Sequence, residues 1–142
     1  MKLSNLLSLN ALLALGFGIA FALYAPLMMA FFGVPEIPSE DILLYWIVAS
    51  FARMFGAALF GIGLLLWAVR GVAVQPDTSP EVRRGIIFAM LLANAMGAFV
   101  AATQQFSIWL SAAGLIVIAI FTALVVAYVY FLIRKPDLED HL

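Results

Sequence analysis

The stretch that decides the fold covers residues 43–67 and reads LLYWIVASFARMFGAALFGIGLLLW. These 25 residues are apolar except for two hydroxyl groups and one charge, Arg53. At about 1.5 Å of rise per residue, a helix of this length crosses the hydrocarbon core of a bilayer, which is about 30 Å thick. We therefore predict a transmembrane helix over residues 43–68, with the other helices packed around it.

The composition points to an integral membrane protein. Of the 142 residues, 66% are hydrophobic and only 11% are charged, and a water-soluble domain needs more charge to cover its surface. We predict a single membrane domain, with no room left for a soluble catalytic domain. The formal net charge of −1 gives no reason to expect nucleic acid as a partner.

The residue types that carry chemistry inside membranes are scarce in this chain. It has no cysteine, and its one histidine, His141, is next to the last residue. This argues against disulfides, thiolate chemistry, a haem held by paired histidines and an intramembrane zinc site. No Asp or Glu falls inside a predicted span, so acid–base and nucleophilic groups are missing there. We predict that the protein is not an enzyme and carries no cofactor.

Three further apolar runs predict helices, over residues 6–32, 82–104 and 107–133. Lys2 before the first run leaves a signal peptide as a competing interpretation, but the run is much longer than a usual signal core. Pro26 should bend this helix. Ser79 followed by Pro80 is typical of the start of a helix, and we expect Ser107 to cap the fourth helix.

The basic residues predict the orientation. In a four-span arrangement six of them fall on one side and none on the other: Lys2, Arg70, Arg83, Arg84, Arg134 and Lys135. Since cytoplasmic loops carry the excess of Lys and Arg, both termini should be cytoplasmic. The short connections favour antiparallel neighbours and hence an up-down-up-down bundle.

Arg53 lies ten residues into the predicted second helix, where a charge is costly, at about 2.5–3.5 kcal/mol on insertion scales. Small residues recur around it in four-residue steps, at Ala49, Ala57 and Gly61. Such a stripe allows helix backbones to approach closely. We therefore predict that Arg53 faces the interior of the bundle and not the lipid.

Asn94 of the third helix lies at a similar depth, so the two side chains should meet near the midplane of the membrane. Three interpretations of Arg53 remain open. In the first, Arg53 is structural, and it bonds Asn94, Ser50, backbone carbonyls or the acidic residues Glu40 and Asp41. Alternatively, its guanidinium is free to bind an anionic headgroup or carboxylate, or it pairs with an acidic residue of another subunit.

The third predicted helix has two further features. Gln104 lies in its short polar exit, where it either lines an outer mouth of the bundle or forms part of a hydrated turn. Small residues recur every four positions along the helix, at Ala89, Ala93, Gly97 and Ala101. This ladder predicts a close helix contact at Gly97.

Residues 51–67, FARMFGAALFGIGLLLW, resemble the second helix of small bacterial four-helix membrane proteins of the DoxX-like type. Those proteins also carry an arginine two or three residues before a glycine in an apolar helix, here Arg53 and Gly56. Those proteins also have short loops and a basic cytoplasmic side. The resemblance covers most of the chain in layout. It implies a four-helix fold in a bacterial inner membrane, and it implies no established activity.

We expect non-catalytic binding of a lipid-like or anionic amphiphile inside the bundle, with Arg53, Asn94, Ser50 and Gln104 as the ligand-binding residues. An accessory or scaffolding subunit of a larger membrane complex is one alternative, and a small-solute transporter is another. Membrane lipids are the expected partners. A second copy of the chain or a larger membrane complex is the alternative partner.

Overall fold

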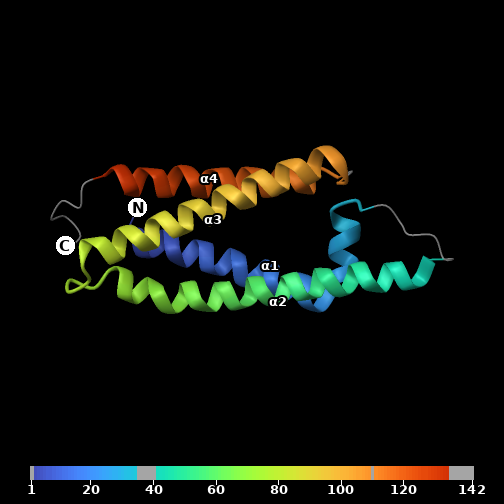
Figure 1. Ribbon diagram of the computed structural model, residues 1–142, viewed down its shortest axis with the longest axis horizontal. Helices are drawn as coiled ribbons and strands as arrows, with labels where there is room; N and C mark the ends of the chain where they lie inside the picture. Colours follow the sequence, from blue (N-terminus) through green and yellow to red (C-terminus); the bar gives the residue numbers. More distant parts are fainter. Residues whose placement is uncertain (1, 35–40, 110, 135–142) are drawn as a thin grey trace.

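The computed structural model describes residues 2–34, 41–109 and 111–134. These residues contain no β-strand and form four helices (Figure 1): α1 (Leu3–Phe31), α2 (Ile42–Ala73), α3 (Pro80–Ser107) and α4 (Ala113–Ile133). Each helix is long and apolar enough to cross a membrane. The predicted fold class, an all-α bundle of four membrane-length helices, is confirmed.

The bundle consists of two helical pairs whose shared core lies at one end. α1 packs along α2 and α3 packs along α4, whereas contacts between the two pairs are few. The core lies where α1 begins, α4 ends and the chain passes from α2 to α3 (Figure 1). Large apolar side chains from all four helices form it: Leu3, Leu6, Leu7, Leu66, Ile87, Leu124 and Tyr128.

Small residues at seven-residue intervals hold α1 against α2. The buried ones are Ala11, Gly18 and Ala25 on α1 and Ala49, Gly56 and Gly63 on α2. A Cβ at Gly18 would lie 2.6 Å from the backbone nitrogen of Phe60, and one at Gly56 would lie 2.8 Å from the carbonyl oxygen of Gly18. The two backbones are therefore in direct contact, which requires glycine at these positions.

This seven-residue stripe replaces the four-residue stripe predicted from the sequence. Ala49 is buried as expected, but Ala57 and Gly61 are exposed, and a Cβ at Gly61 would meet nothing within 4 Å. In a helix of 3.6 residues per turn, a step of four advances by about 40°, whereas a step of seven falls short by about 20°. Successive four-residue steps therefore turn away from α1, while seven-residue steps stay against it.

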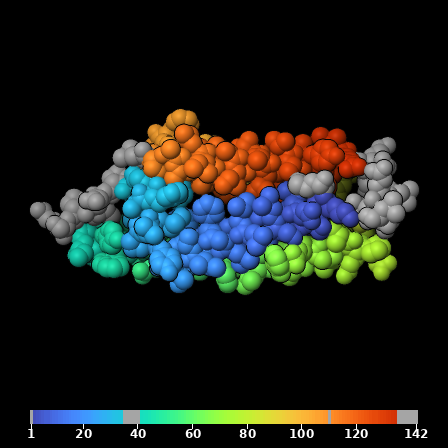
Figure 2. Space-filling view, turned by 180° about the vertical axis from the view of Figure 1, so that it is seen from behind, coloured from blue at the N-terminus to red at the C-terminus, as the bar shows by residue number. Residues whose placement is uncertain are grey.

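Pro26 bends α1, as predicted. The backbone departs from helical geometry at Tyr24 (φ −122°, ψ 37°), two residues before the proline. Proline removes one backbone donor, and its ring crowds the preceding turn. Seen from behind, the last turns of α1 rise from the side of α2 to meet the start of α4 (Figure 2).

The bent end of α1 is anchored to the connection between α3 and α4. The ring of Phe32 packs against that of Trp109, with 4.5 Å between centroids, and the hydroxyl of Ser111 donates to the carbonyl oxygen of Phe31 at 2.7 Å. Gly33, at φ 67°, then ends the helix in the left-handed conformation that glycine adopts most readily. The bend thus links the two helical pairs at the end remote from the core.

Two helix starts test the capping predictions. The hydroxyl of Ser79 accepts a hydrogen bond from the backbone N–H of Val82 at 3.3 Å, so the predicted cap of α3 is confirmed. The predicted cap at Ser107 is wrong, because Ser107 is the last residue of α3 and its hydroxyl donates to the carbonyl oxygen of Thr103. α4 begins later, at Ala113.

Basic side chains join the helices at the core end. The guanidinium of Arg70 stacks on the ring of Trp67 at 3.5 Å and donates to the hydroxyl of Ser8 at 3.0 Å. Nε of Arg83 donates to the carbonyl oxygen of Ala73 at 3.1 Å. Other residues used in the sequence interpretation lie outside the described residues: Glu40, Lys135 and His141.

Candidate binding cavity

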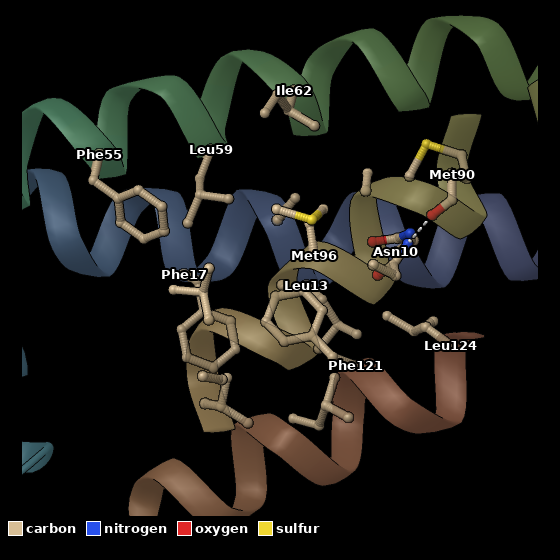
Figure 3. A pocket seen from close by; sticks show the side chains of 18 of the residues that line it. Asn10, Leu13, Phe17, Phe55, Leu59, Ile62, Met90, Met96, Phe121 and Leu124 are labelled. Carbon is tan, nitrogen blue, oxygen red and sulfur yellow. Dashed lines mark hydrogen bonds between the residues drawn. The ribbon is translucent and has the colours of Figure 1, made fainter. Parts of the chain in front are cut away.

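A cavity of about 380 Å³ lies between the two helical pairs. All four helices contribute to its almost entirely apolar walls: Leu13 and Phe17 come from α1, Leu59 from α2, Met96 from α3 and Phe121 from α4 (Figure 3). The cavity exists because α3 diverges from α2 as it leaves the core (Figure 1). Its volume is within the range of small-molecule sites, about 300–1,000 Å³.

Two asparagines form the polar part of the cavity. Asn10 and Asn94 are 7% and 3% exposed, they are the buried polar residues among those described, and both line the cavity. Nδ2 of Asn10 donates to the hydroxyl of Tyr128 at 3.2 Å, and Nδ2 of Asn94 donates to the carbonyl oxygen of Met90 at 2.7 Å. In the described part of the chain neither Oδ1 accepts a hydrogen bond, which leaves two acceptors for a ligand.

Aromatic rings close the opposite end of the cavity. Phe17 and Phe55 lie toward this end, away from Asn10 (Figure 3). The rings of Phe21 and Phe55 meet edge to face, with 5.6 Å between centroids, and Trp109 also lines the cavity. The site is therefore polar at one end and aromatic at the other.

The cavity opens sideways between α2 and α3. Phe55 and Ile62 of α2 line it and yet are 54% and 48% exposed, and Met96 and Val100 of α3 line it and are 61% and 48% exposed. The lining residues of α1 and α4 are all buried or half-buried. A molecule would therefore reach the cavity from the side of the bundle, between α2 and α3.

Of the four residues predicted to bind a ligand, Asn94 alone lines the cavity. Arg53 is exposed on the outside of α2, so the prediction that it faces the interior is wrong. The hydrogen bond to Asn94, one of the interpretations left open for Arg53, is not formed: Asn94 donates to Met90 of its own helix, and Arg53 makes no hydrogen bond with the described residues. The reason is geometric, because Arg53 lies about 40–60° around α2 from the seam formed by Ala49 and Gly56.

The remaining two predicted residues lie apart from the cavity. Ser50 is exposed, and its hydroxyl donates to the carbonyl oxygen of Trp46 at 2.7 Å on its own helix. Gln104 is half-buried near the end of α3, where its carbonyl oxygen accepts hydrogen bonds from the N–H groups of Ile108 and Trp109 at 2.8 and 2.9 Å. A ligand-binding role for either residue stays a prediction.

Asn10 is the residue that the sequence interpretation missed. It stands in an apolar run, eight residues after Lys2, and Tyr128 stands six residues before Arg134 in another apolar run. The two polar groups therefore lie at similar depths in helices that begin and end at the same end of the bundle (Figure 1). This match in depth is the sequence feature that could have predicted the contact between Asn10 and Tyr128.

We expect Tyr128→Phe to lower the free energy of unfolding by about 1 kcal/mol, because it leaves the amide of Asn10 without its partner in a buried place. The double variant Asn10→Leu/Tyr128→Phe should recover most of this loss, since both polar groups are then gone. Thermal unfolding in detergent would measure both. Additive losses in the double variant would show that the two residues are not coupled.

No family model, curated protein or solved structure matches the chain. No group of three or more potential metal-ligating side chains occurs in the described residues. The residues that line the cavity include no charged side chain. By its chemistry, the cavity suits a neutral molecule with an apolar body and one hydrogen-bonding group.

Proposed function

We propose that this protein is a non-catalytic binding protein of the bacterial inner membrane that holds a neutral, lipid-like amphiphile between its two helical pairs. One observation carries the proposal. The apolar cavity of about 380 Å³ has its polar groups, Asn10 and Asn94, in one part and aromatic rings in another. This pattern matches a molecule with a polar head and an apolar body. Both termini would be cytoplasmic, and successive helices would cross the membrane in opposite directions.

The ligand should be neutral. Burying an unpaired charge is far more costly than burying a neutral polar group that gains a hydrogen bond. The cavity offers amide groups and no charged side chain to offset such a cost. A hydroxyl group is the simplest match, because it can donate to the free Oδ1 of Asn94.

The ligand should come from the bilayer. The opening between α2 and α3 lies along the flank of membrane-length helices, where lipid would surround them. The exposed rims of the opening are apolar side chains, namely Phe55, Ile62, Met96 and Val100. A molecule dissolved in the membrane would enter without passing through water.

The test uses ω-bromododecanol, a long-chain alcohol with bromine at the end remote from the hydroxyl, and Trp109 as the reporter. In the background Trp46→Phe/Trp67→Phe only Trp109 emits, and bromine quenches its fluorescence on contact. With the hydroxyl at the asparagines, the bromine reaches the aromatic end. We expect saturable quenching, and Asn94→Leu should weaken it about fivefold, the value of one hydrogen bond of about 1 kcal/mol.

Two controls make this result specific. Asn5→Leu is the same substitution at an exposed position of α1 and should leave the quenching unchanged. Bromododecane, which lacks the hydroxyl, should bind wild type and Asn94→Leu equally. Linear, non-saturable quenching in wild type would reject the cavity as a binding site, and equal alcohol binding by Asn94→Leu would reject the role of the amide.

A further inference from the structure

Arg53 is a cation on the exposed surface of α2, about 40–60° around the helix from the buried seam residues Ala49 and Gly56. In the described residues it forms no ion pair and no hydrogen bond, and its one polar contact is with the ring of Trp46. It does not line the cavity. Its guanidinium is therefore open to a partner that the described residues do not supply.

The two tryptophans of α2 locate Arg53 in depth. Trp46 and Trp67 are 21 positions apart, which is about 31 Å along a helix and close to the thickness of the hydrocarbon core. Tryptophan rings prefer the two membrane interfaces. The Cα of Arg53 then lies about 10 Å below the interface marked by Trp46.

The side chain of Arg53 is directed back toward that interface. Its Cζ lies 6.0 Å from the centroid of the Trp46 ring, although Trp46 precedes it by seven residues, which is two helical turns. Long basic side chains near membrane interfaces extend in this way, with the apolar stem in the hydrocarbon and the charge at the level of the headgroups. In the proposed membrane placement the guanidinium would lie near the level of the headgroups and away from the middle of the membrane.

An open apolar groove lies beside it on the same helix. The groove has a volume of about 340 Å³ and includes Trp46, Ser50 and Met54 in its walls. Its apolar lining suits an acyl chain, and the ring of Trp46, which Arg53 contacts, is one of its walls. Cation and groove thus match the two parts of one phospholipid.

We propose that Arg53, beside the ring of Trp46, binds the phosphate of an anionic phospholipid in the leaflet that surrounds the start of α2, with an acyl chain in the adjoining groove. The guanidinium presents several N–H donors in a planar fork that fits phosphate oxygens. The observations favour a lipid over an acidic side chain of a partner helix, because the charge is directed toward the headgroups. This site rests on the membrane placement proposed above and is independent of a ligand in the cavity.

The test measures lipid preference next to Trp46. In the background Trp67→Phe/Trp109→Phe only Trp46 emits, and the protein is reconstituted into vesicles of brominated phosphatidylglycerol, brominated phosphatidylcholine or their mixtures. We expect phosphatidylglycerol to be preferred about fivefold, the factor that one basic side chain supplies near an anionic membrane surface. Arg53→Gln should remove the preference, and Arg53→Lys should retain part of it.

Controls separate this site from other charges and other ligands. Arg84→Gln is the same substitution at an exposed position near the start of α3 and should leave the preference unchanged. Soluble glycerol phosphate should not compete, because it lacks the acyl chain. Equal quenching by both lipids in wild type, or an unchanged preference in Arg53→Gln, would overturn the proposal.

A partner protein would give a different pattern. If Arg53 pairs with an acidic residue of another helix, Arg53→Gln should change the mass of the complex in native mass spectrometry and leave lipid preference as in wild type, and that result would also overturn the proposal. If the lipid preference next to Trp46 is not found, the quenching of Trp109 by ω-bromododecanol can still be observed. The lipid site and the cavity ligand are therefore tested separately. Unchanged melting of Arg53→Gln would confirm that loss of preference is local.

Discussion

Gly56→Ala is expected to separate α1 from α2 and to lower the free energy of unfolding by about 3 kcal/mol, near the upper end of overpacking effects. The added methyl group would overlap the backbone nitrogen of Ala22 and lie 2.8 Å from both the carbonyl oxygen of Gly18 and the carbonyl carbon of Phe21. All three atoms belong to a helix backbone, which has no alternative rotamer. Relief therefore requires movement of α1 as a whole. Thermal or chemical unfolding in detergent would measure the loss.

Gly61→Ala is the matched control on the same helix. Gly61 is exposed, and a Cβ there would meet nothing within 4 Å. Alanine also has a better helix propensity than glycine, by about 1 kcal/mol in soluble helices. We expect unchanged or slightly raised stability. If Gly56→Ala and Gly61→Ala behave alike, the seam does not run along the seven-residue stripe.

Gly97→Leu is expected to weaken binding of ω-bromododecanol in the cavity by about tenfold or more. A Cβ at Gly97 would lie 2.7–2.9 Å from ring atoms of Phe121, so α3 has the predicted close contact at this glycine, although it meets a side chain of α4 and not a helix backbone. Ala89 and Ala93 of the predicted ladder are exposed. Both residues line the cavity. The leucine side chain, or the ring that it displaces, would therefore occupy the space that the ligand needs.

The stability cost of Gly97→Leu should be smaller than that of Gly56→Ala, although leucine is the larger residue. At Gly97 the obstacle is the far end of a side chain next to an empty volume, whereas at Gly56 it is backbone. Gly85→Leu, at an exposed position of α3 where a Cβ meets nothing, is the control for the substitution itself. Saturable quenching of Trp109 in Gly97→Leu, equal to that in Gly85→Leu, would contradict the placement of the ligand.

Local chemistry explains the features that the sequence predicted well. Four apolar runs of membrane length became four helices, because a long apolar segment satisfies its backbone groups internally only as a helix. Pro26 bends α1 and Ser79 caps α3 because both effects arise within a few residues of the chain. The same reasoning failed at Ser107, where α3 continued through a polar run that allows either a helix or a turn.

The sequence by itself therefore determined how many helices there are, approximately where they lie and that they suit a membrane. Only the tertiary structure decided how each helix is rotated. In a soluble protein, polar residues mark the outer face, but here both the lipid-facing and the buried faces are apolar, so hydrophobic periodicity does not distinguish them. Arg53 was placed inside on a four-residue stripe, whereas backbone contact between α1 and α2 at Gly18 and Gly56 turns it outward. The cavity also depends on the tertiary structure, because Asn10 and Asn94 line one cavity only where α3 diverges from α2.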